Sequence, residues 1–189
     1  MSVKDLIVAS RSYRSFDRSA SLSHEQLADF VECARLSPSS RNLQVLKFRL
    51  VCTEADCAKV FPLTRWAGLI KDRKIPPVGH EPSAYVIVCI DQALTSDLAP
   101  FQRDVGIAAQ SILLAATEAG FGGCMIGSFS AAALKDTLSL PTHILPQLVI
   151  ALGKPDEQIV LTDAKNGVAY YREGDLHIVP KRSLEEILI

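Results

Sequence analysis

Residues 103–119 read RDVGIAAQSILLAATEA, the longest helical pattern of the chain. Apolar side chains occupy nearly every side of this segment, which predicts a long central helix that is buried in the fold. The residue that follows, Gly120, is typical of the left-handed position at which a helix ends. Earlier in the chain, Ala84 to Ile90 form an unbroken apolar run, AYVIVCI, as expected of a fully buried strand.

The rest of the chain mixes helical and strand patterns without a regular βαβ order. Two capping boxes, Ser23-His-Glu-Gln26 and Ser183-Leu-Glu-Glu186, mark the starts of two further helices, the first of which should end near Ser37. We also expect an opening helix around Val3–Ile7, a strand over 46–52, mostly helix over 54–71, a loop over 72–83, a strand over 123–126, a helix from Ser130, a strand over 147–152 and a hairpin of 168–172 with 177–179. This mixture predicts an α+β fold, and because no repeat or linker divides residues 1–189, we expect a single domain.

The composition is that of an ordinary globular protein, with 189 residues, of which 48% are hydrophobic and 22% charged. The net charge of −1 provides no overall attraction to nucleic acid or to an anionic membrane. The apolar run from Ala84 to Ile90 is too short to span a bilayer, and the N-terminus lacks the apolar core of a signal peptide. We therefore expect a cytoplasmic protein without nucleic-acid or membrane partners.

The cysteines and histidines give little sign of metal or thiol chemistry. The chain has 5 Cys without a C-x-x-C pair, and its 4 His share no metal-ligand spacing, so no metal site is predicted. Cys52 and Cys89 lie in strand patterns, where cysteine is usually a small buried hydrophobe. Cys124 follows two glycines and leaves a thiol enzyme as an alternative, although no partner histidine is predicted near it.

Other catalytic motifs are absent from the sequence. The glycines of Gly120-Phe-Gly-Gly123 follow a helix and precede a strand, the reverse of the order in a dinucleotide-binding loop. The chain contains no G-x-x-x-x-G-K-S/T, G-x-S-x-G or H-E-x-x-H motif. Asp104, near the start of the long helix, is expected to compensate the helix dipole rather than to act as a base. No side chain is therefore predicted as a catalytic nucleophile or base.

Three polar segments are candidates for ligand binding. Arg11-Ser-Tyr-Arg14 places two guanidinium groups around a hydroxyl, which suits a phosphate, although a solvated basic loop is the alternative. Residues 37–44, SPSSRNLQ, carry hydroxyls and amides that can recognise the edge of a heteroaromatic ring, although turn chemistry alone also accounts for them. Lys181 and Arg182 precede the last helix, as expected if an anion lies between them. If that helix packs beside the N-terminal helix, all four cations can converge on one phosphate.

In their order and spacing, these segments resemble the nitroreductase family of FMN-dependent oxidoreductases. The resemblance rests on RSYRSF at 11–16, SPSSRNLQ at 37–44, D-x-GIAAQSILLAA at 104–116, G-x-GGCMIGS at 120–128, LVIALGKP at 148–155 and PKRSLEEI at 180–187. The motifs extend from about Leu6 to Leu188. The resemblance implies an α+β homodimer whose central, mostly antiparallel sheet is flanked by helices, with FMN at the subunit interface.

The resemblance also implies which residues bind the cofactor. Arg11, Ser12 and Arg14 would hold the phosphate and ribityl end of FMN, with Lys181 and Arg182 closing on the phosphate. Pro38, Ser39, Ser40 and Asn42 would contact the flavin ring from the partner subunit, with Gln44 beside them. Ile126, Gly127 and Ser128 would lie along the ring, with Cys124 and Met125 behind them.

The activity that the resemblance implies is that of an NAD(P)H-dependent flavin oxidoreductase. By a ping-pong mechanism, hydride would pass from NAD(P)H to flavin N5 and then to a small electron-poor acceptor, such as a nitroaromatic or a quinone. The cofactor carries this chemistry, so the chain only positions and tunes it. The alternative is a flavin carrier or sensor, or a flavin-degrading relative without nitroreductase turnover.

Overall fold

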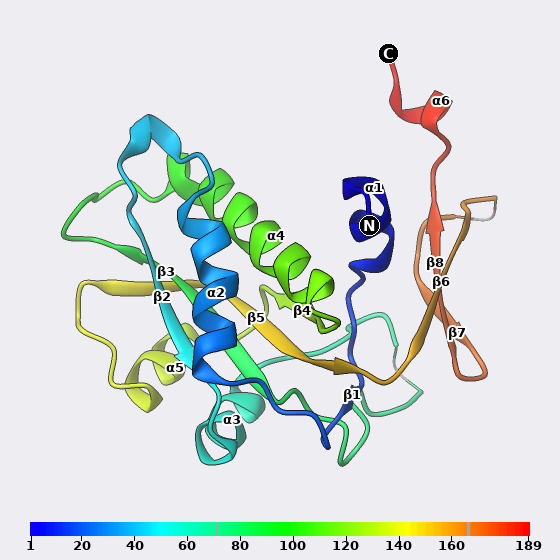
Figure 1. Cartoon of the computed structure of the whole chain (residues 1–189), viewed down its shortest axis with the longest axis horizontal. Coiled ribbons are helices and arrows are strands. Elements are labelled where there is room, and N and C mark those ends of the chain that lie inside the picture. Colours follow the sequence, from blue (N-terminus) through cyan, green and yellow to red (C-terminus); the bar gives the residue numbers. More distant parts are fainter. Residues whose placement is uncertain (71, 166) are drawn as a thin grey trace.

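The computed structural model describes residues 1–70, 72–165 and 167–189, and its centre is an antiparallel sheet with helices on both faces (Figure 1). In chain order the elements are α1 (Val3–Ala9), β1 (Phe16–Asp17), α2 (His24–Arg35), the 3-10 helix η1 (Ser40–Asn42), β2 (Leu46–Val51), α3 (Glu54–Val60), η2 (Phe61–Leu63), β3 (Ala84–Asp91), η3 (Ala99–Phe101), α4 (Gln102–Glu118), β4 (Gly122–Ile126), α5 (Ala131–Thr137), β5 (Ile144–Pro155), β6 (Gln158–Asp163), β7 (Tyr171–Glu173), β8 (Leu176–Lys181) and α6 (Leu184–Ile187). The predicted α+β class is confirmed. Among the described residues, no helix has both the length and the apolar character that crossing a membrane requires.

The strands form two sheets. The main sheet has five strands in the order β1-β5-β3-β2, with β4 also paired to β5, and all of its pairs are antiparallel. The second sheet has three strands in the order β6-β8-β7, in which β6 is parallel and β7 antiparallel to β8. In Figure 1 this second sheet stands beside the end of β5, on the same side as the N-terminal segment.

The core lies on both faces of the main sheet, and β3 divides it. Every residue of β3 is buried, as the sequence predicts. Val86 and Val88 face α2 and α4 and belong to one apolar cluster, whereas Tyr85 and Ile87 belong to a second cluster with residues of α3 and α5. Because side chains alternate along a strand, an unbroken apolar run is the pattern that two covered faces require.

The long helix α4 ends as the sequence predicts but is not buried all round. Gly120 has a φ of +79°, and the N–H of Phe121 donates to the Ala116 carbonyl at 2.8 Å, which closes the last turn. The face of α4 that includes Ala109 and Ile112 packs on the sheet. The opposite face is open in the single chain, where Ile107 is 41% exposed. In a single chain, the prediction that this helix is buried on nearly every side is therefore wrong.

Two other predictions needed correction. The helix expected over 54–71 ends at Val60, because Pro62 has no N–H to continue it and Thr64 is extended; residue 71 lies outside the described part of the chain. The strand β6 was not predicted, and the hairpin strand expected over 168–172 is confined to β7. β6 is mostly exposed and carries only a weak alternating pattern, so its pairing with β8 had no clear signal in the sequence.

Candidate functional site

The segment that carries Arg11 and Arg14 is fixed to the edge of the main sheet. The N–H of Tyr13 donates to the carbonyl of Gly123 at 3.0 Å. A Cβ atom on Gly123 would lie 2.2 Å from a carbonyl oxygen of β5, so only glycine permits this close packing. Phe16 follows, fully buried, and pairs with the end of β5. These contacts hold the main chain from which the two arginine side chains extend.

A cavity of about 290 Å³, which we call cavity A, lies beside this segment. Its lining consists of Ser10, Arg11, Ser12, Arg14, Gln110, Leu113, Met125, Ile159, Tyr170, His177, Val179 and Lys181. Three predicted cations, Arg11, Arg14 and Lys181, thus meet from opposite ends of the chain. None of the described residues that line cavity A is an Asp or a Glu. This balance of charge favours an anion, and arginine forks suit phosphate oxygens in particular.

Two polar atoms of cavity A are buried and have no hydrogen-bond partner in the described part of the chain: Arg11 Nε and His177 Nδ1. The Arg11 guanidinium also donates from Nη2 to the carbonyl of Ile7 in the last turn of α1, where a cation interacts favourably with the helix dipole. Buried polar groups without a partner are rare in folded proteins. The acceptor atoms of a bound ligand would supply partners.

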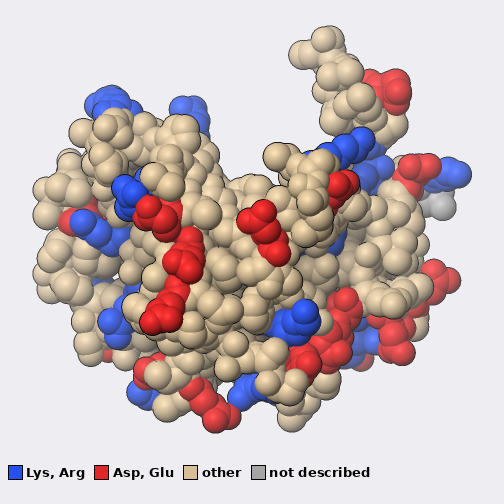
Figure 2. All heavy atoms as spheres, in the orientation of Figure 1, with Lys and Arg blue, Asp and Glu red and all other residues tan. Residues whose placement is uncertain are grey.

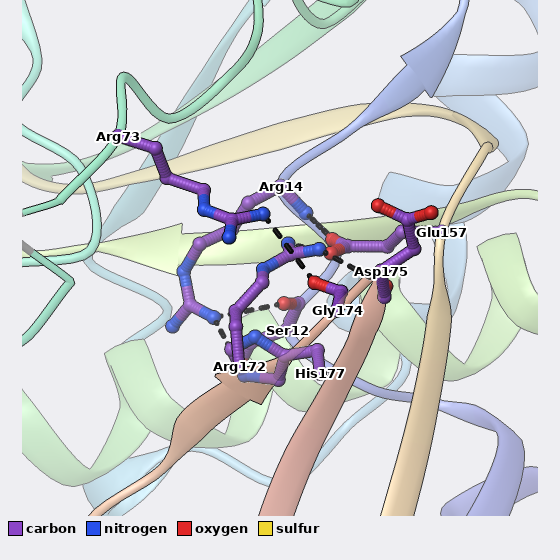
Figure 3. Close-up of polar contacts among 8 residues, drawn as sticks. All are labelled: Ser12, Arg14, Arg73, Glu157, Arg172, Gly174, Asp175 and His177. Atoms are coloured by element: carbon purple, nitrogen blue, oxygen red, sulfur yellow. Dashed lines mark hydrogen bonds and ion pairs between the residues drawn. The ribbon is translucent and has the colours of Figure 1, made fainter.

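The second sheet reaches cavity A through a polar cluster around Arg14 (Figure 3). Nη1 of Arg14 lies 3.5 Å from Nε2 of His177, and the guanidinium lies over the Tyr170 ring, 4.9 Å from its centroid. Glu157 forms an ion pair with Arg172 and accepts a hydrogen bond from the N–H of Arg14. The side chains of Arg172 and Glu157 are only 10% and 3% exposed. This cluster joins the N-terminal segment to the strands β7 and β8.

A second cavity of about 250 Å³, cavity B, lies against the N-terminal half of α4. Its lining consists of Ala34, Arg35, Ser37, Pro38, Ser39, Asn42, Gln44, Leu46, Lys47, Phe48, Asp104, Ile107 and Ala108. Four of the predicted residues, Pro38, Ser39, Asn42 and Gln44, therefore lie together, away from the cations of cavity A. Ser39 Oγ is buried and has no partner among the described residues. One chain thus carries two separate cavities, each lined by four of the thirteen predicted residues.

The loop that lines cavity B has an unusual main chain. Arg41, Asn42 and Gln44 have φ angles of 54°, 55° and 51°, all in the left-handed region. Residues other than glycine adopt this region rarely, and such positions cluster at binding sites. Ser40 of this loop does not line cavity B, but its hydroxyl and its N–H both donate to the buried carboxylate of Asp104, which does. The loop is therefore tied to α4 in a defined conformation.

Four other predicted residues lie outside both cavities. Ile126 is 4% exposed and belongs to the core cluster with α3 and α5, whereas Gly127 and Ser128 are exposed at the end of β4. Arg182 pairs with Glu186 at 3.5 Å. Figure 1 shows α6 projecting away from α1, so the expected packing of the two terminal helices is not seen and only Lys181 joins the arginines.

Sequence reasoning missed several residues of cavity A. Met125 was expected behind the ring, but it lines the cavity, because Cys124 and Ile126 on either side of it point into the core. Strand alternation could have given this result. Tyr170 and His177 had no signal, since nothing in the sequence places the hairpin beside Arg14.

Figure 2 shows the surface around these residues. A hollow separates the α4 side of the molecule from the projecting C-terminal end, and Lys and Arg side chains gather on the C-terminal side of it. Acidic side chains also lie on that side, close to the basic ones.

Comparison with known proteins gives the family. The sequence profile described as "Nitroreductase family" matches residues 7–154. The chain belongs to the nitroreductase family. A protein of Methanothermobacter thermautotrophicus, provisionally named an NADH dehydrogenase/NAD(P)H nitroreductase, is 26% identical over 161 residues, which cover 83% of this chain and 79% of the relative.

Solved nitroreductase structures share the fold. A nitroreductase family protein from Clostridium novyi NT has a TM-score of 0.67 at 20% identity and covers 98% of this chain and 99% of its own. A provisionally named nitroreductase from Exiguobacterium sibiricum 255-15, solved in complex with FMN, has a TM-score of 0.69 at 17% identity and covers 83% of this chain and 90% of its own. The likeness to the Clostridium novyi structure spans nearly the whole chain, whereas the family profile ends at residue 154.

The thiol of Cys124, on which the thiol-enzyme alternative rests, is buried in this nitroreductase-family chain. Cys124 is 4% exposed, and burial raises the pKa of its thiol despite the nearby Arg14. A neutral, buried thiol is a poor nucleophile. This finding disfavours the thiol-enzyme alternative.

Proposed function

We propose that the chain is an FMN-dependent oxidoreductase that takes hydride from NAD(P)H and passes it through flavin N5 to a small electron-poor acceptor by a ping-pong mechanism. One observation carries the proposal: Arg11, Arg14 and Lys181 surround cavity A, and no described lining residue there is acidic. In this nitroreductase-family chain, that arrangement fits the phosphate of FMN. The FMN in the Exiguobacterium relative supports the same choice of cofactor.

The buried polar atoms of the two cavities fit such a cofactor. Arg11 Nε in cavity A can donate to phosphate or ribityl oxygens, and Ser39 Oγ in cavity B can bond to the edge of a flavin ring. Asn42 and Gln44 carry amides that match both donors and acceptors of that edge. When bound, FMN supplies the hydride chemistry, so the chain needs no nucleophile or general base of its own.

We further propose a homodimer in which cavity B of one chain meets cavity A of the other. Each cavity alone falls below the roughly 300–1,000 Å³ that ligand pockets occupy. The open face of α4 lies between them, and Leu184 and Ile187 of α6 and Leu188, which follows it, are 62%, 62% and 66% exposed. A second copy would cover these apolar surfaces. Residues 1–189 would then act as one FMN-binding domain, and the chain's unpaired cysteines suit a reducing cytoplasm.

The absorption spectrum of the purified protein, with mass spectrometry of the ligand released by heat, tests the cofactor. Release of FMN supports the proposal, whereas FAD, or no flavin after reconstitution, contradicts it. Anaerobic addition of NADH and of NADPH then tests the activity. Bleaching of the flavin within seconds indicates a reductase, and an unchanged spectrum favours a flavin carrier.

A further inference from the structure

The guanidinium of Arg14 contacts His177, as Figure 3 shows, and also the ring of Tyr170. Its Nη1 lies 3.2 Å from the carbonyl of Ser12 and 3.5 Å from Nε2 of His177. Its plane lies over the ring of Tyr170, which stacks on His177 with a centroid distance of 5.3 Å. Among the described residues, the guanidinium donates only through Nη1, so Nε and Nη2 are available to a ligand in cavity A.

The chemistry of this contact fixes the state of His177. An arginine can only donate, so a hydrogen bond across this contact requires that Nε2 accepts and that the ring proton lies on Nδ1. His177 is 1% exposed, and its burial, followed by the charges of Arg14 and Arg172, lowers its pKa to about 4. At neutral pH the ring is therefore uncharged and able to accept.

A further charged group near His177 is Arg172, whose positive charge also lowers the pKa of the ring. Arg172 on β7 lies beside the ring, and its charge is balanced by Glu157, which joins β5 to β6. Glu157 also accepts from the main-chain N–H of Arg14. The main chain of Arg14 is thus held by Glu157, and its guanidinium by His177 and Tyr170.

We propose that His177 is a positioning residue, which holds the Arg14 guanidinium in the orientation that binds a phosphate monoester in cavity A. A free arginine side chain loses much rotamer freedom when it binds a ligand, and a fixed acceptor removes that loss beforehand. The identity of the phosphate monoester as FMN rests on the proposed function. The pairing of His177 with Arg14 does not.

Two variants of His177 distinguish a role in positioning the Arg14 guanidinium from a role in packing alone. In His177→Gln, the Oε1 atom can take the place of the Nε2 acceptor, whereas His177→Leu fills the space without an acceptor. We expect His177→Leu to weaken FMN binding about tenfold and riboflavin binding less than about twofold, and His177→Gln to remain within about threefold of the parent for both. Fluorescence titration of the flavin-free protein measures these affinities, and urea unfolding checks that both variants fold.

A purely structural role predicts the opposite order. A buried glutamine is harder to accommodate than a leucine, so His177→Gln would then be the weaker binder and the less stable protein. Equal losses for FMN and riboflavin in His177→Leu would likewise overturn the inference.

The hydrogen bond between Arg14 and His177 can be tested by spectroscopy in the flavin-free chain. Long-range ¹H–¹⁵N correlation of the histidine rings in the flavin-free chain should give the neutral Nδ1–H tautomer for His177 at pH 7, with the signal assigned by its absence in His177→Gln. Arg14→Met should convert this ring to the Nε2–H tautomer. An Nε2–H or charged ring in the parent protein overturns the inference. A parent chain that has the expected tautomer but binds no flavin refutes the proposed function and leaves the pairing supported.

Discussion

The hydroxyl of Ser40 donates to Oδ1 of Asp104 at 2.8 Å, and the N–H of Ser40 donates to Oδ2 of the same carboxylate at 2.9 Å. Asp104 is 3% exposed and lies in the first turn of α4, where a negative charge also interacts favourably with the helix dipole. The expected dipole role thus holds, but the carboxylate also anchors the loop of cavity B. This contact connects the loop, which has three left-handed residues, to the central helix.

Replacing Asp104 with alanine should release this loop. Two hydrogen bonds to a charged acceptor are lost and the donors of Ser40 remain, so we expect the free energy of unfolding to fall by about 2–3 kcal/mol. Trypsin should then cleave after Arg41, which is exposed, faster than in the parent. Urea unfolding and timed proteolysis measure both effects. Asp29→Ala, at an exposed position of α2, is the control and should change neither.

Arg14, which lines cavity A, should contribute to phosphate binding, whereas Arg182, which lies outside the cavity, should not. Arg14→Ala should weaken FMN binding by about one to two decades, because charge-assisted hydrogen bonds contribute roughly 1.5–3 kcal/mol and 1.4 kcal/mol is tenfold. Riboflavin, which has no phosphate, should bind almost as well as to the parent. Arg182→Ala is the matched control, since Arg182 pairs with Glu186 outside the cavity, and it should change either affinity less than about twofold. Equal losses of affinity for FMN and riboflavin in Arg14→Ala would mean that Arg14 supports the fold and does not bind the phosphate.

Local sequence signals accounted for much of the fold. The capping boxes at Ser23 and Ser183 form as expected, because each requires only residues three positions apart. The buried strand β3 and the stop at Gly120 also follow from local pattern and from the freedom of glycine. Cavity A brings together three of the four cations that were expected to converge from the two ends of the chain, Arg11, Arg14 and Lys181.

The parts that were missed depend on contacts distant in sequence. The β6 strand exists because β8 offers it a parallel partner, and no local pattern encodes that partner. In the sequence, His177 looks like any residue of a half-buried strand. Its contact with Arg14, 163 positions away, follows only from the position of the hairpin in the fold. Arg182 was assigned to the phosphate with Lys181, but neighbouring residues at the end of a strand point to opposite sides.

The ion pair between Glu157 and Arg172 should be important for stability. Both side chains are at least nine-tenths buried, and removing one charge leaves the other buried without compensation. Glu157→Gln should therefore lower the free energy of unfolding by about 3 kcal/mol in urea titrations. Glu32→Gln, which breaks the pair with Arg35 between side chains that are 49% and 60% exposed, should leave the urea midpoint nearly unchanged. Equal effects of the two variants would contradict this account of burial.

The cysteines should differ sharply in reactivity. Burial raises the pKa of Cys57 to about 11, that of Cys89 to about 12, and also that of Cys124, so at pH 8 these thiols are protonated in the folded chain. An aromatic disulfide reagent should react rapidly with the exposed Cys33, and Cys33→Ser should remove this phase. Rapid reaction of Cys124 in the native protein would contradict this expectation and support the thiol-enzyme alternative.

The same pKa shifts give a pH dependence of stability. The thiols are harder to ionise in the folded chain than in the unfolded one, so their contribution is complete below the unfolded pKa, about 8.5. It should be lost as the pH rises from there toward 11. Urea titrations of the parent and of Cys89→Ala between pH 7 and pH 10 check this, since the variant should lose less stability over that range.

The division of the proposed site between two chains can be tested by complementation. Arg14→Ala damages cavity A, and Asn42→Gly damages cavity B while keeping the left-handed main chain that Asn42 adopts. The two variants, carried on chains with different affinity tags, are co-expressed and purified as mixed dimers. If cavity A of one chain meets cavity B of the other, one of the two sites in each mixed dimer is intact, and about half of the parent's FMN content should be recovered. Pairing a double variant, Arg14→Ala with Asn42→Gly, with an unchanged chain should recover none, because every site then has one defect. The reverse result, with flavin in the second dimer and none in the first, would place both halves of the site on one chain and overturn the proposed arrangement.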